Sequence, residues 1–330
     1  MPAWREPRVR SLARRNAHPV AVWRRARRRR ATALHPVARP FMVPSAGLRY
    51  VPVPSTPASC IDHLTCVKVK AIAPAFTFCS PHRKEYHGVT AKGVWEPFET
   101  WAFAQALRAE PHAQVLDVGA RSGWFSILAA TRKNNTHHVI AVEANRNATC
   151  VEAHNAAKNG VSRQITIVNN GADKIEREMK LSGMAMHSSD QHYNLTAGEA
   201  AFTAQTQTVS TIRLDTLLPL FKSDVLVMKM DIEGFECEAL MGAATLLRRV
   251  RVAFLMMEWD GGFKAQSRGC DWLEAVRPLR EQGLQPYDTE VLKRRGTDAP
   301  VFQFNPGLVR KTNCIAWRQS RPRAANIAEL

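Results

Sequence analysis

Short apolar runs and helical repeats alternate along the middle of the chain. Mostly apolar runs at 114–118, 139–142 and 225–230 are rich in Val, Ile, Leu and Met, and each run predicts a buried strand. The segment after each run carries apolar residues every three or four positions, which predicts an amphipathic helix. Strands that alternate with helices are typical of an α/β fold with a mostly parallel sheet.

Weaker patterns predict further elements on both sides of these runs. They are a helix at 94–110 that ends before Pro111, strands at 164–172 and 252–260, a polar inserted hairpin or loop at 173–212, a short helix at 214–221, a helix around 237–247, helices near 271–282, and strands at 284–289 and 314–318. Asn159-Gly160 predicts the end of the helix after 139–142, because both residues tolerate a left-handed helix cap.

Charge is distributed unevenly along the 330 residues. The formal net charge is +17, yet residues 1–50 hold 13 Arg, no Lys and one Glu, so +12 of it lies in this short segment. The same region is rich in proline, and such a composition buries too little apolar area to offset its ordering entropy. We therefore expect residues 1–57 to be a disordered basic tail and residues 58–330 to form one domain.

The Arg-rich tail has several interpretations that the sequence leaves open. The run at 23–30 fits nuclear targeting or polyanion binding. The whole Arg-rich, acid-poor segment also fits an organelle transit peptide. It further fits a solvated tail without a specific role, or a translation start that really lies later, at Met42. A secretory signal fits poorly, because no apolar core precedes a small-residue cleavage site. No run reaches the roughly 18 apolar residues of a transmembrane helix.

Seven cysteines are spread along the chain without a CxxC pair. Their spacing matches no common zinc module, so we expect free or buried thiols, with disulfides among Cys60, Cys66 and Cys79 only if the protein is secreted. Glycosylation sequons occur at Asn134, Asn147 and Asn194. Without a secretory signal these sequons are weak indications.

The segment QVLDVGARSGWFSILAA at 114–130 has the order strand, glycine turn and helix. Glycines at 119 and 123 let a ligand approach the backbone, and the N-terminus of the next helix faces that ligand. A dinucleotide fingerprint needs a middle glycine for the pyrophosphate, and Arg121 stands there instead. Asp117 suits a cation or an amino group. A cofactor with an amino-acid end and no phosphates therefore fits better, which argues against an oxidoreductase.

Acidic side chains follow the next predicted strands. Glu143 ends the strand at 139–142, about 20 residues after the glycine turn, where a carboxylate accepts hydrogen bonds from ribose hydroxyls. Ligands of open α/β sheets bind at the carboxyl ends of the strands, and buried charges are costly unless functional or paired. We therefore expect a ligand site at the strand ends that carry Lys229, Asp231, Glu233, Gly234, Glu236, Glu258 and Asp260.

Four segments, LDVGARSGWFSILAA, VIAVEAN, TIRLDTLL and MKMDIEGFECEALMGA, resemble in order and spacing the FkbM-type family of S-adenosylmethionine-dependent O-methyltransferases. The resemblance covers residues 93–260, and its most specific part is the lysine-x-aspartate-x-glutamate-glycine-x-glutamate string at 229–236. It implies the Rossmann-like sandwich of class I methyltransferases, with a seven-stranded, mostly parallel sheet and helices on both faces. The tail at 1–57 lies outside it.

The same resemblance implies roles for individual residues. Arg121 departs from the family pattern, which often has a small polar residue at that position. The family acts on sugars, glycans, polyketides and other small hydroxylated molecules. By this resemblance Asp117, Gly119, Ala120 and Gly123 would line the methionine end of S-adenosylmethionine, Glu143 would hold its ribose, Gly171 and Ala172 would lie near its adenine, and Glu96 resembles a family glutamate before the first strand.

Methyl transfer to a hydroxyl needs alignment of the reactants and a base that takes the proton. We expect Asp231 or Glu233 to be that base, with Lys229 lowering the pKa of the acid or orienting the substrate. The alternative is a structural ion pair between Lys229 and Glu233 or Glu236. We assign no metal to these carboxylates.

Two rival functions use the same fold. A nucleic-acid methyltransferase would use the Arg-rich tail as an electrostatic arm, but DIEG stands where an Asn-Pro-Pro-aromatic string would be expected. A non-catalytic module would bind the cofactor without turnover. We therefore expect a small-molecule or glycan hydroxyl as the acceptor.

Overall fold

The computed structural model describes residues 61, 64–81, 83–132, 138–182, 194–196, 206–259, 268–295 and 312–319. All of them belong to one compact unit, residues 42–330. The tail expected at 1–57 lies outside the described residues, so its disorder and the domain boundary at 58 stay predictions.

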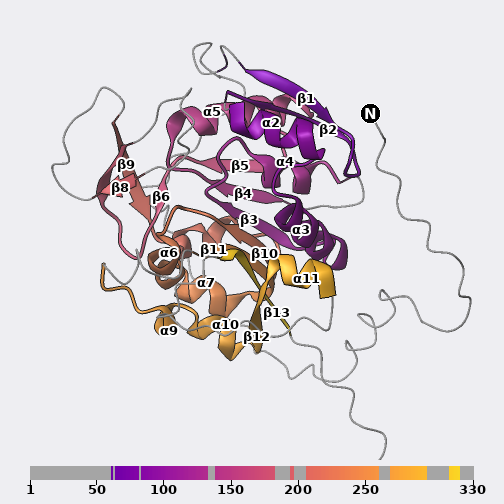
Figure 1. Ribbon diagram of the computed structural model, residues 1–330. Coiled ribbons are helices and arrows are strands. Elements are labelled where there is room, and N and C mark those ends of the chain that lie inside the picture. The colour runs from indigo at the N-terminus through magenta and orange to yellow at the C-terminus, as the bar shows by residue number, and fades with distance from the viewer. Residues whose placement is uncertain are drawn as a thin grey trace, which may run out of the picture. The chain divides into compact units, whose positions relative to one another are not determined.

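A seven-stranded sheet forms the centre of the described fold (Figure 1). Every pair of neighbours is parallel except the two that β13 makes with β11 and β12. The expected seven-stranded, mostly parallel sheet is therefore confirmed. The strands β3 and β4 are buried on both faces, which explains why their sequences are mostly apolar and do not alternate. The order is β12 (Leu284–Asp288), β13 (Thr312–Gln319), β11 (Arg251–Trp259), β10 (Val225–Met230), β3 (Gln114–Val118), β4 (Val139–Val142) and β5 (Ile165–Val168).

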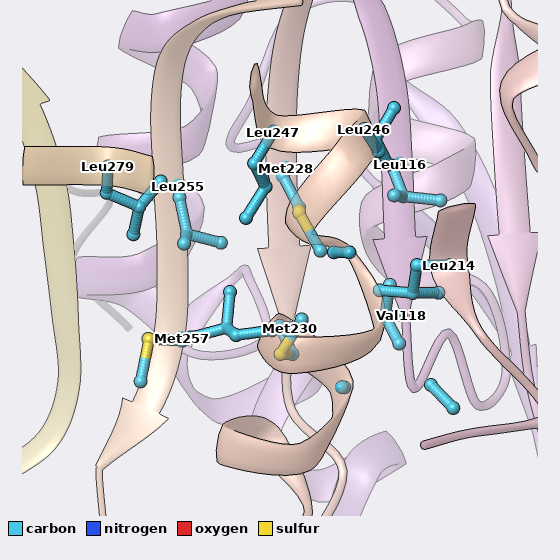
Figure 2. Close-up of a cluster of buried hydrophobic side chains, with 14 of the residues drawn as sticks. Leu116, Val118, Leu214, Met228, Met230, Leu246, Leu247, Leu255, Met257 and Leu279 are labelled. Carbon is cyan, nitrogen blue, oxygen red and sulfur yellow. The ribbon is translucent and has the colours of Figure 1, made fainter. Parts of the chain in front are cut away.

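Helices cover both faces of this sheet, because successive side chains of a strand point to opposite sides. Leu116 and Val118 pack into the core shown in Figure 2, whereas Val115 packs into a second core on the other face. None of the described helices is both long and apolar enough to span a membrane. The first core takes side chains from η3 (Leu214–Leu220), α6 (Glu236–Gly242), α7 (Ala244–Arg249), α9 (Trp272–Ala275) and α10 (Arg277–Glu281), and the second takes them from α3 (Pro97–Ala109), α4 (Trp124–Ala130), α5 (Arg146–Lys158) and α11 (Thr289–Arg295).

Two predicted elements are divided in the structure. The run at 164–172 forms β5 and then the two-residue strand β6 (Gly171–Ala172). Between them, the side-chain amide of Asn169 donates to the carbonyl of Glu143 at 2.9 Å, and that of Asn170 donates to the carbonyl of Ser210 at 3.0 Å. These contacts turn the chain away from the central sheet. The helix expected around 237–247 ends at Gly242 and resumes as α7.

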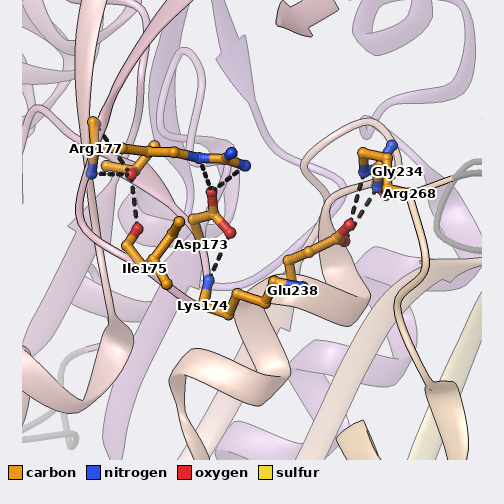
Figure 3. A network of polar contacts seen from close by, with 8 residues as sticks. Asp173, Lys174, Ile175, Arg177, Gly234, Glu238 and Arg268 are labelled. Carbon is orange, nitrogen blue, oxygen red and sulfur yellow. Dashed lines mark hydrogen bonds and ion pairs between the residues drawn. The ribbon is translucent and has the colours of Figure 1, made fainter. Parts of the chain in front are cut away.

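The described part of the polar insertion at 173–212 forms a second sheet together with β6, and its antiparallel pair of β7 and β8 agrees with the hairpin that was one of the two expectations. β6 pairs with β9 (Gln207–Ile212), and β9 pairs antiparallel with β7 (Glu178–Ser182), which pairs antiparallel with β8 (Asn194–Thr196). The buried carboxylate of Asp173 anchors its start by accepting hydrogen bonds from Arg177 Nε at 2.8 Å and from the backbone of Lys174 at 2.6 Å (Figure 3).

The segment before residue 93 folds into elements that the apolar pattern did not predict. β1 (Thr65–Val69) and β2 (Phe76–Ser80) form an antiparallel hairpin, and α2 (Arg83–Lys92) follows. Asn155 of α5 exchanges hydrogen bonds with the backbone of Cys79 at 2.9 and 2.8 Å, and Asn159 does the same with Thr77 at 2.8 and 2.7 Å. These partners are 76 and 82 residues apart, so no local pattern reveals the attachment.

The expectation of free thiols is wrong for most of the described cysteines. Cys66 and Cys79 form a disulfide across the β1–β2 hairpin, and Cys237 and Cys270 form one between α6 and the segment before α9. Cys150 is also disulfide-bonded, whereas Cys314 is a buried free thiol. Sequence spacing could not reveal these pairs, because cysteines 33 residues apart become neighbours only when α6 and α9 pack together.

A methyl group added at position 242 would collide with the backbone of Asp173, the residue after β6. A Cβ built on Gly242 falls 2.2 Å from the carbonyl oxygen of Asp173. We predict that Gly242→Ala lowers the free energy of unfolding by about 1–3 kcal/mol, because side-chain rotation cannot relieve a clash with backbone. Urea denaturation followed by far-UV circular dichroism measures this change.

Gly160 offers the matched control. A Cβ built there meets no atom within 4 Å, and the φ of 69° is a conformation that asparagine tolerates. We therefore expect Gly160→Asn to cost less than about 1 kcal/mol. Equal losses in the two variants would contradict the proposed steric clash.

Candidate functional site

A cavity of about 660 Å³ lies at the carboxyl ends of β3, β4 and β10. The chain runs outward from β3 through β4 to β5 and then returns to β10 on the other side of β3. Ligands of open α/β sheets bind at such a reversal of strand order, because the loops there diverge. The wall is formed by α2, by the segment before α3, by the loops after β3, β4 and β10, and by β6.

The glycine turn after β3 presses against the loop after β10. Gly119 has a φ of 79°, and a Cβ built on it would fall 1.8 Å from the carbonyl oxygen of Asp231. The backbone N–H of Asp231 donates to the carbonyl of Val118 at 2.9 Å, which holds the two loops together. Gly119 is therefore required by this close approach as well as by any ligand. Gly119 and Ala120 both line the cavity, and their contact with the methionine end of a cofactor stays a prediction.

Glu143 joins the loop after β4 to the glycine turn. Its Oε2 accepts a hydrogen bond from the backbone N–H of Arg121 at 2.8 Å, and its Oε1 accepts one from Asn145 at 2.7 Å. Burial raises the pKa of this carboxyl, although these hydrogen bonds and the charge of Arg121 oppose the rise. Each oxygen retains a second lone pair, so the group can still accept hydrogen bonds from a ligand in the cavity.

Arg121 takes a structural part that the sequence did not reveal. Its φ is 52°, and its guanidinium forms an ion pair with Glu85 of α2. Glu85 is buried and also accepts hydrogen bonds from the hydroxyl groups of Ser80 and, at 3.0 Å, Ser122. This network fixes α2 over the glycine turn. No local pattern marks Glu85, because two of its three partners, Arg121 and Ser122, come from the distant glycine turn.

Two residues expected to contact the cofactor lie behind the cavity wall. Asp117 is fully buried, and its Oδ2 accepts a hydrogen bond from Ser126 Oγ at 2.7 Å. Gly123, with a φ of 84°, packs against Glu152, since a Cβ built there would lie 2.6 Å from Glu152 Cγ. Neither Asp117 nor Gly123 is among the residues that line the cavity.

Glu152 is a fully buried carboxyl beneath the glycine turn. Neither of its oxygens has a hydrogen-bond partner within the described part of the chain. Burial, reinforced by the negative charge of Asp117, raises its pKa well above the ordinary value. One oxygen of Asp117, Oδ1, likewise has no partner within that part. The high pKa of Glu152 favours its neutral form, which avoids a second buried charge beside Asp117.

Lys229 is the buried cation at the centre of the site. Its Nζ lies 3.3 Å from Asp231 Oδ2, donates to the carbonyl of Gly119 at 3.2 Å, and lies 5.4 Å from the ring centroid of Phe125. Burial alone would lower the pKa of this ammonium, but the carboxylates of Asp231, Asp117 and Glu96 together raise it. Lys229 is therefore charged, and it orients Asp231 within the cavity wall.

The two glutamates of the turn after β10 have different positions. Glu233, with a φ of 59°, lines the cavity beside Asp231. Glu236 is buried, and its Oε1 accepts a hydrogen bond from the backbone of Ile232 at 2.8 Å. Burial raises the pKa of Glu236 to about 7. Glu236 therefore has a structural part through the backbone of Ile232 and not through the ion pair expected as the alternative, because Lys229 pairs with Asp231.

Glu96 and the strand β6 complete the wall of the cavity. Glu96 precedes α3 with a φ of 42°, and burial together with the charge of Asp231 raises its pKa to about 8. Gly171 and Ala172 are buried in β6 and line the opposite part. The structure therefore brings together these expected residues along one cavity: Glu96, Gly119, Ala120, Glu143, Gly171, Ala172, Lys229, Asp231 and Glu233.

One group of acids has the geometry to hold a metal ion. Carboxylate oxygens of Asp231, Glu236 and Glu258 lie within 4.8 Å of one another. Exposed or pocket-lining acids often cluster in this way without an ion, so we assign no metal to the group.

Trp95 and Phe235 also line the cavity and were missed, because aromatic residues at loop ends resemble ordinary core positions in sequence.

Solved structures with a similar arrangement include three methyltransferases. An O-methyltransferase described as SAM-dependent, from Thermotoga maritima, is 12% identical, with 70% of this chain and 67% of that chain covered and a TM-score of 0.34. An O-methyltransferase from Bacillus cereus in complex with SAH is 12% identical, with 72% and 89% covered and a TM-score of 0.35. The O-methyltransferase TomG from Streptomyces achromogenes, in complex with SAM, is 13% identical, with 72% and 88% covered and a TM-score of 0.34. Similarities this low support no conclusion about activity.

Comparison with protein families gives the stronger result. No curated protein matches the chain. The family model of the methyltransferase FkbM domain matches residues 117–284, which is just over half of the 330 residues. This range contains the glycine turn, Glu143 and the turn after β10. The chain therefore belongs to the FkbM methyltransferase family.

Proposed function

We propose that this methyltransferase transfers a methyl group from S-adenosylmethionine to a hydroxyl of a small molecule or glycan. The observation that carries the proposal is the shared cavity at the reversal of strand order. There the glycine turn, the buried Glu143 carboxylate and the Lys229–Asp231 pair line or adjoin one space. Such a space can hold a cofactor and an acceptor together, which methyl transfer requires.

The residues present fit S-adenosylmethionine. The Glu143 carboxylate suits ribose hydroxyls, the backbone of Gly119 and Ala120 lines the space for the methionine end, and the small β6 residues leave room for the adenine. When bound, the cofactor supplies a methyl group on a positively charged sulfur. The cavity suits this cation, because the acids that line it outnumber the lysines and arginines even when Glu96 is neutral: Glu85, Glu143, Asp231, Glu233 and Glu258 against Lys92, Arg121 and Lys229.

The same charge distribution favours an uncharged hydroxylated acceptor. Carboxylates accept hydrogen bonds from hydroxyl groups, whereas they repel the phosphates of a nucleic acid. Asp231 and Glu233 are the proposed bases, and Lys229 orients Asp231 through their ion pair. Glu236 is tied to the backbone of Ile232, which supports a structural part for it instead.

The cofactor assignment predicts a specific loss of binding. Glu143→Ala removes the charged acceptor at the ribose position, and hydrogen bonds to charged groups contribute about 1.5–3 kcal/mol. We therefore expect the Kd for S-adenosylhomocysteine to rise roughly 10- to 100-fold in isothermal titration calorimetry. Glu281→Gln, at an exposed position on α10, is the control and should bind as the wild type does. Absence of binding in the wild type would refute the assignment.

The acceptor class can be tested with labelled cofactor. We predict that methyl-labelled S-adenosylmethionine transfers label to members of a panel of methyl hexosides and catechols, and not to total RNA. Carboxylates around the cavity would repel the RNA backbone, so label in RNA would instead support a nucleic-acid methyltransferase. Binding without label transfer to any member would support a non-catalytic module.

The proposed bases predict a pH-dependent rate. A base accepts a proton only in its deprotonated form. Glu96, with a pKa of about 8, becomes negatively charged above that pH. A negative charge beside Asp231 favours transfer of the acceptor's proton to Asp231. The rate with the best panel acceptor should therefore rise through pH 8 in the wild type, and Glu96→Gln should flatten this rise.

Substitution of the base itself should lower kcat by roughly 100-fold or more. We expect this loss in Asp231→Asn or in Glu233→Gln, with the Kd for S-adenosylhomocysteine changed far less. Steady-state kinetics with both variants measures it. Full activity in both would rule out the two proposed bases.

A further inference from the structure

The turn between β10 and α6, residues 231–235, is held from outside the cavity by Arg268 (Figure 3). The guanidinium donates from Nε to Glu238 Oε1 at 2.6 Å and from Nη2 to Glu238 Oε2 at 3.1 Å. The same Nη2 donates to the carbonyl oxygen of Gly234. A guanidinium that meets a carboxylate with two parallel hydrogen bonds is fixed in orientation as well as in position.

Arg268 also covers the aromatic side chain of the turn. Its Cζ lies 4.2 Å from the ring centroid of Phe235, which lines the cavity. Stacking of a guanidinium on an aromatic face is attractive and restricts the ring. One arginine thus contacts the turn through both the Gly234 carbonyl and the Phe235 ring.

The turn needs such support because its backbone is strained. Glu233 has a φ of 59° and Gly234 a φ of 99°. A non-glycine residue in the left-handed region costs roughly 1 kcal/mol and persists when its surroundings hold it there. Glu233 carries a carboxylate into the cavity wall, so its position depends on this conformation.

A disulfide attaches the segment of Arg268 to the same helix. Cys270, two residues after Arg268, is bonded to Cys237 in the first turn of α6, beside Glu238. The covalent bond keeps the arginine close to its carboxylate partner. We use the term Arg268 clamp for Arg268, Glu238 and the Cys237–Cys270 disulfide.

We propose that Arg268 is a positioning residue for methyl transfer, acting through this clamp to fix Glu233 and Phe235 in the cavity wall. The inference rests on the proposed function, because Glu233 is there a proposed base.

Reduction of the disulfide loosens the clamp. Dithiothreitol supplies two electrons and two protons, the S–S bond becomes two thiols, and dithiothreitol becomes its cyclic disulfide. The complete clamp is therefore suited to an oxidising compartment.

A simpler role for Arg268 is neutralisation of Glu238, whose side chain is only 3% exposed. An unpaired buried carboxylate would destabilise the protein by itself. The double variant Arg268→Met with Glu238→Gln separates the two roles, because it leaves no buried charge and keeps an apolar side chain over Phe235. A purely neutralising arginine predicts a wild-type turn in this variant, whereas a positioning arginine predicts a loose one.

Hydrogen–deuterium exchange on the full chain tests the clamp without an acceptor. We expect the peptide covering 231–235 to exchange about tenfold faster in the double variant, and a peptide covering β10 to stay unchanged. The single variant Arg268→Lys, with Glu238 kept, should exchange at a rate between those of the wild type and the double variant. Arg248→Gln, which breaks an exposed pair with Glu281, is the matched control and should behave as the wild type. Unchanged exchange at 231–235 in the double variant would overturn the proposal.

Kinetic and redox measurements complete the test. The double variant should lose at least about tenfold in kcat with the best panel acceptor, while its Kd for S-adenosylhomocysteine stays within about twofold. Cys237→Ser with Cys270→Ser should loosen the same peptide, whereas Cys66→Ser with Cys79→Ser should leave it unchanged. Equal loosening in both cysteine variants would overturn the assigned part of the disulfide. A wild type that binds no S-adenosylhomocysteine would refute the proposed function and leave the exchange result valid.

Discussion

The close approach of two loops at the end of β3 and β10 is the constraint on which the rest of the site depends. The Cα of Gly119 and the carbonyl of Asp231 meet so closely that no side chain fits between them. This approach lets Lys229 reach the Gly119 carbonyl while it pairs with Asp231. It also leaves the next residues of each loop facing one cavity. This approach is possible because β3 and β10 are neighbours at the reversal of strand order. At such a reversal the loops after neighbouring strands border one cavity.

Buried charge is the second theme, and the fold manages it by pairing. Lys229 stands among acids, Arg121 pairs with the buried Glu85, and Arg268 pairs with Glu238. Glu152 is handled differently, because burial and the negative charge of Asp117 raise its pKa well above the ordinary value and so favour its neutral form. Such groups are expensive in stability, and their concentration around a single cavity is characteristic of a functional site.

Sequence reasoning succeeded wherever the cause was local. The apolar runs predicted the strands β3, β4 and β10, and the glycine spacing predicted the turn that lines the cavity. It failed wherever the partner was distant. The β1–β2 hairpin depends on asparagines of α5, and the expected free thiols proved to be disulfides. Arg121 was seen as a departure from a pattern, and its partner Glu85 carried no signal of its own.

The sequence by itself determined the order of strands and helices, the glycine turn, the acids that follow each strand and the family of the chain, because these depend on residue type and on short-range spacing. Tertiary structure alone decided which acids line the cavity and which lie behind it, and which cysteines and arginines find partners. Asp117 lies near the end of β3 and Glu143 directly follows β4, yet Asp117 contacts a serine of the next helix and Glu143 lines the cavity. The physical reason is that burial and electrostatic pairing depend on the neighbours that folding brings from distant segments, and spacing along the chain does not specify those neighbours.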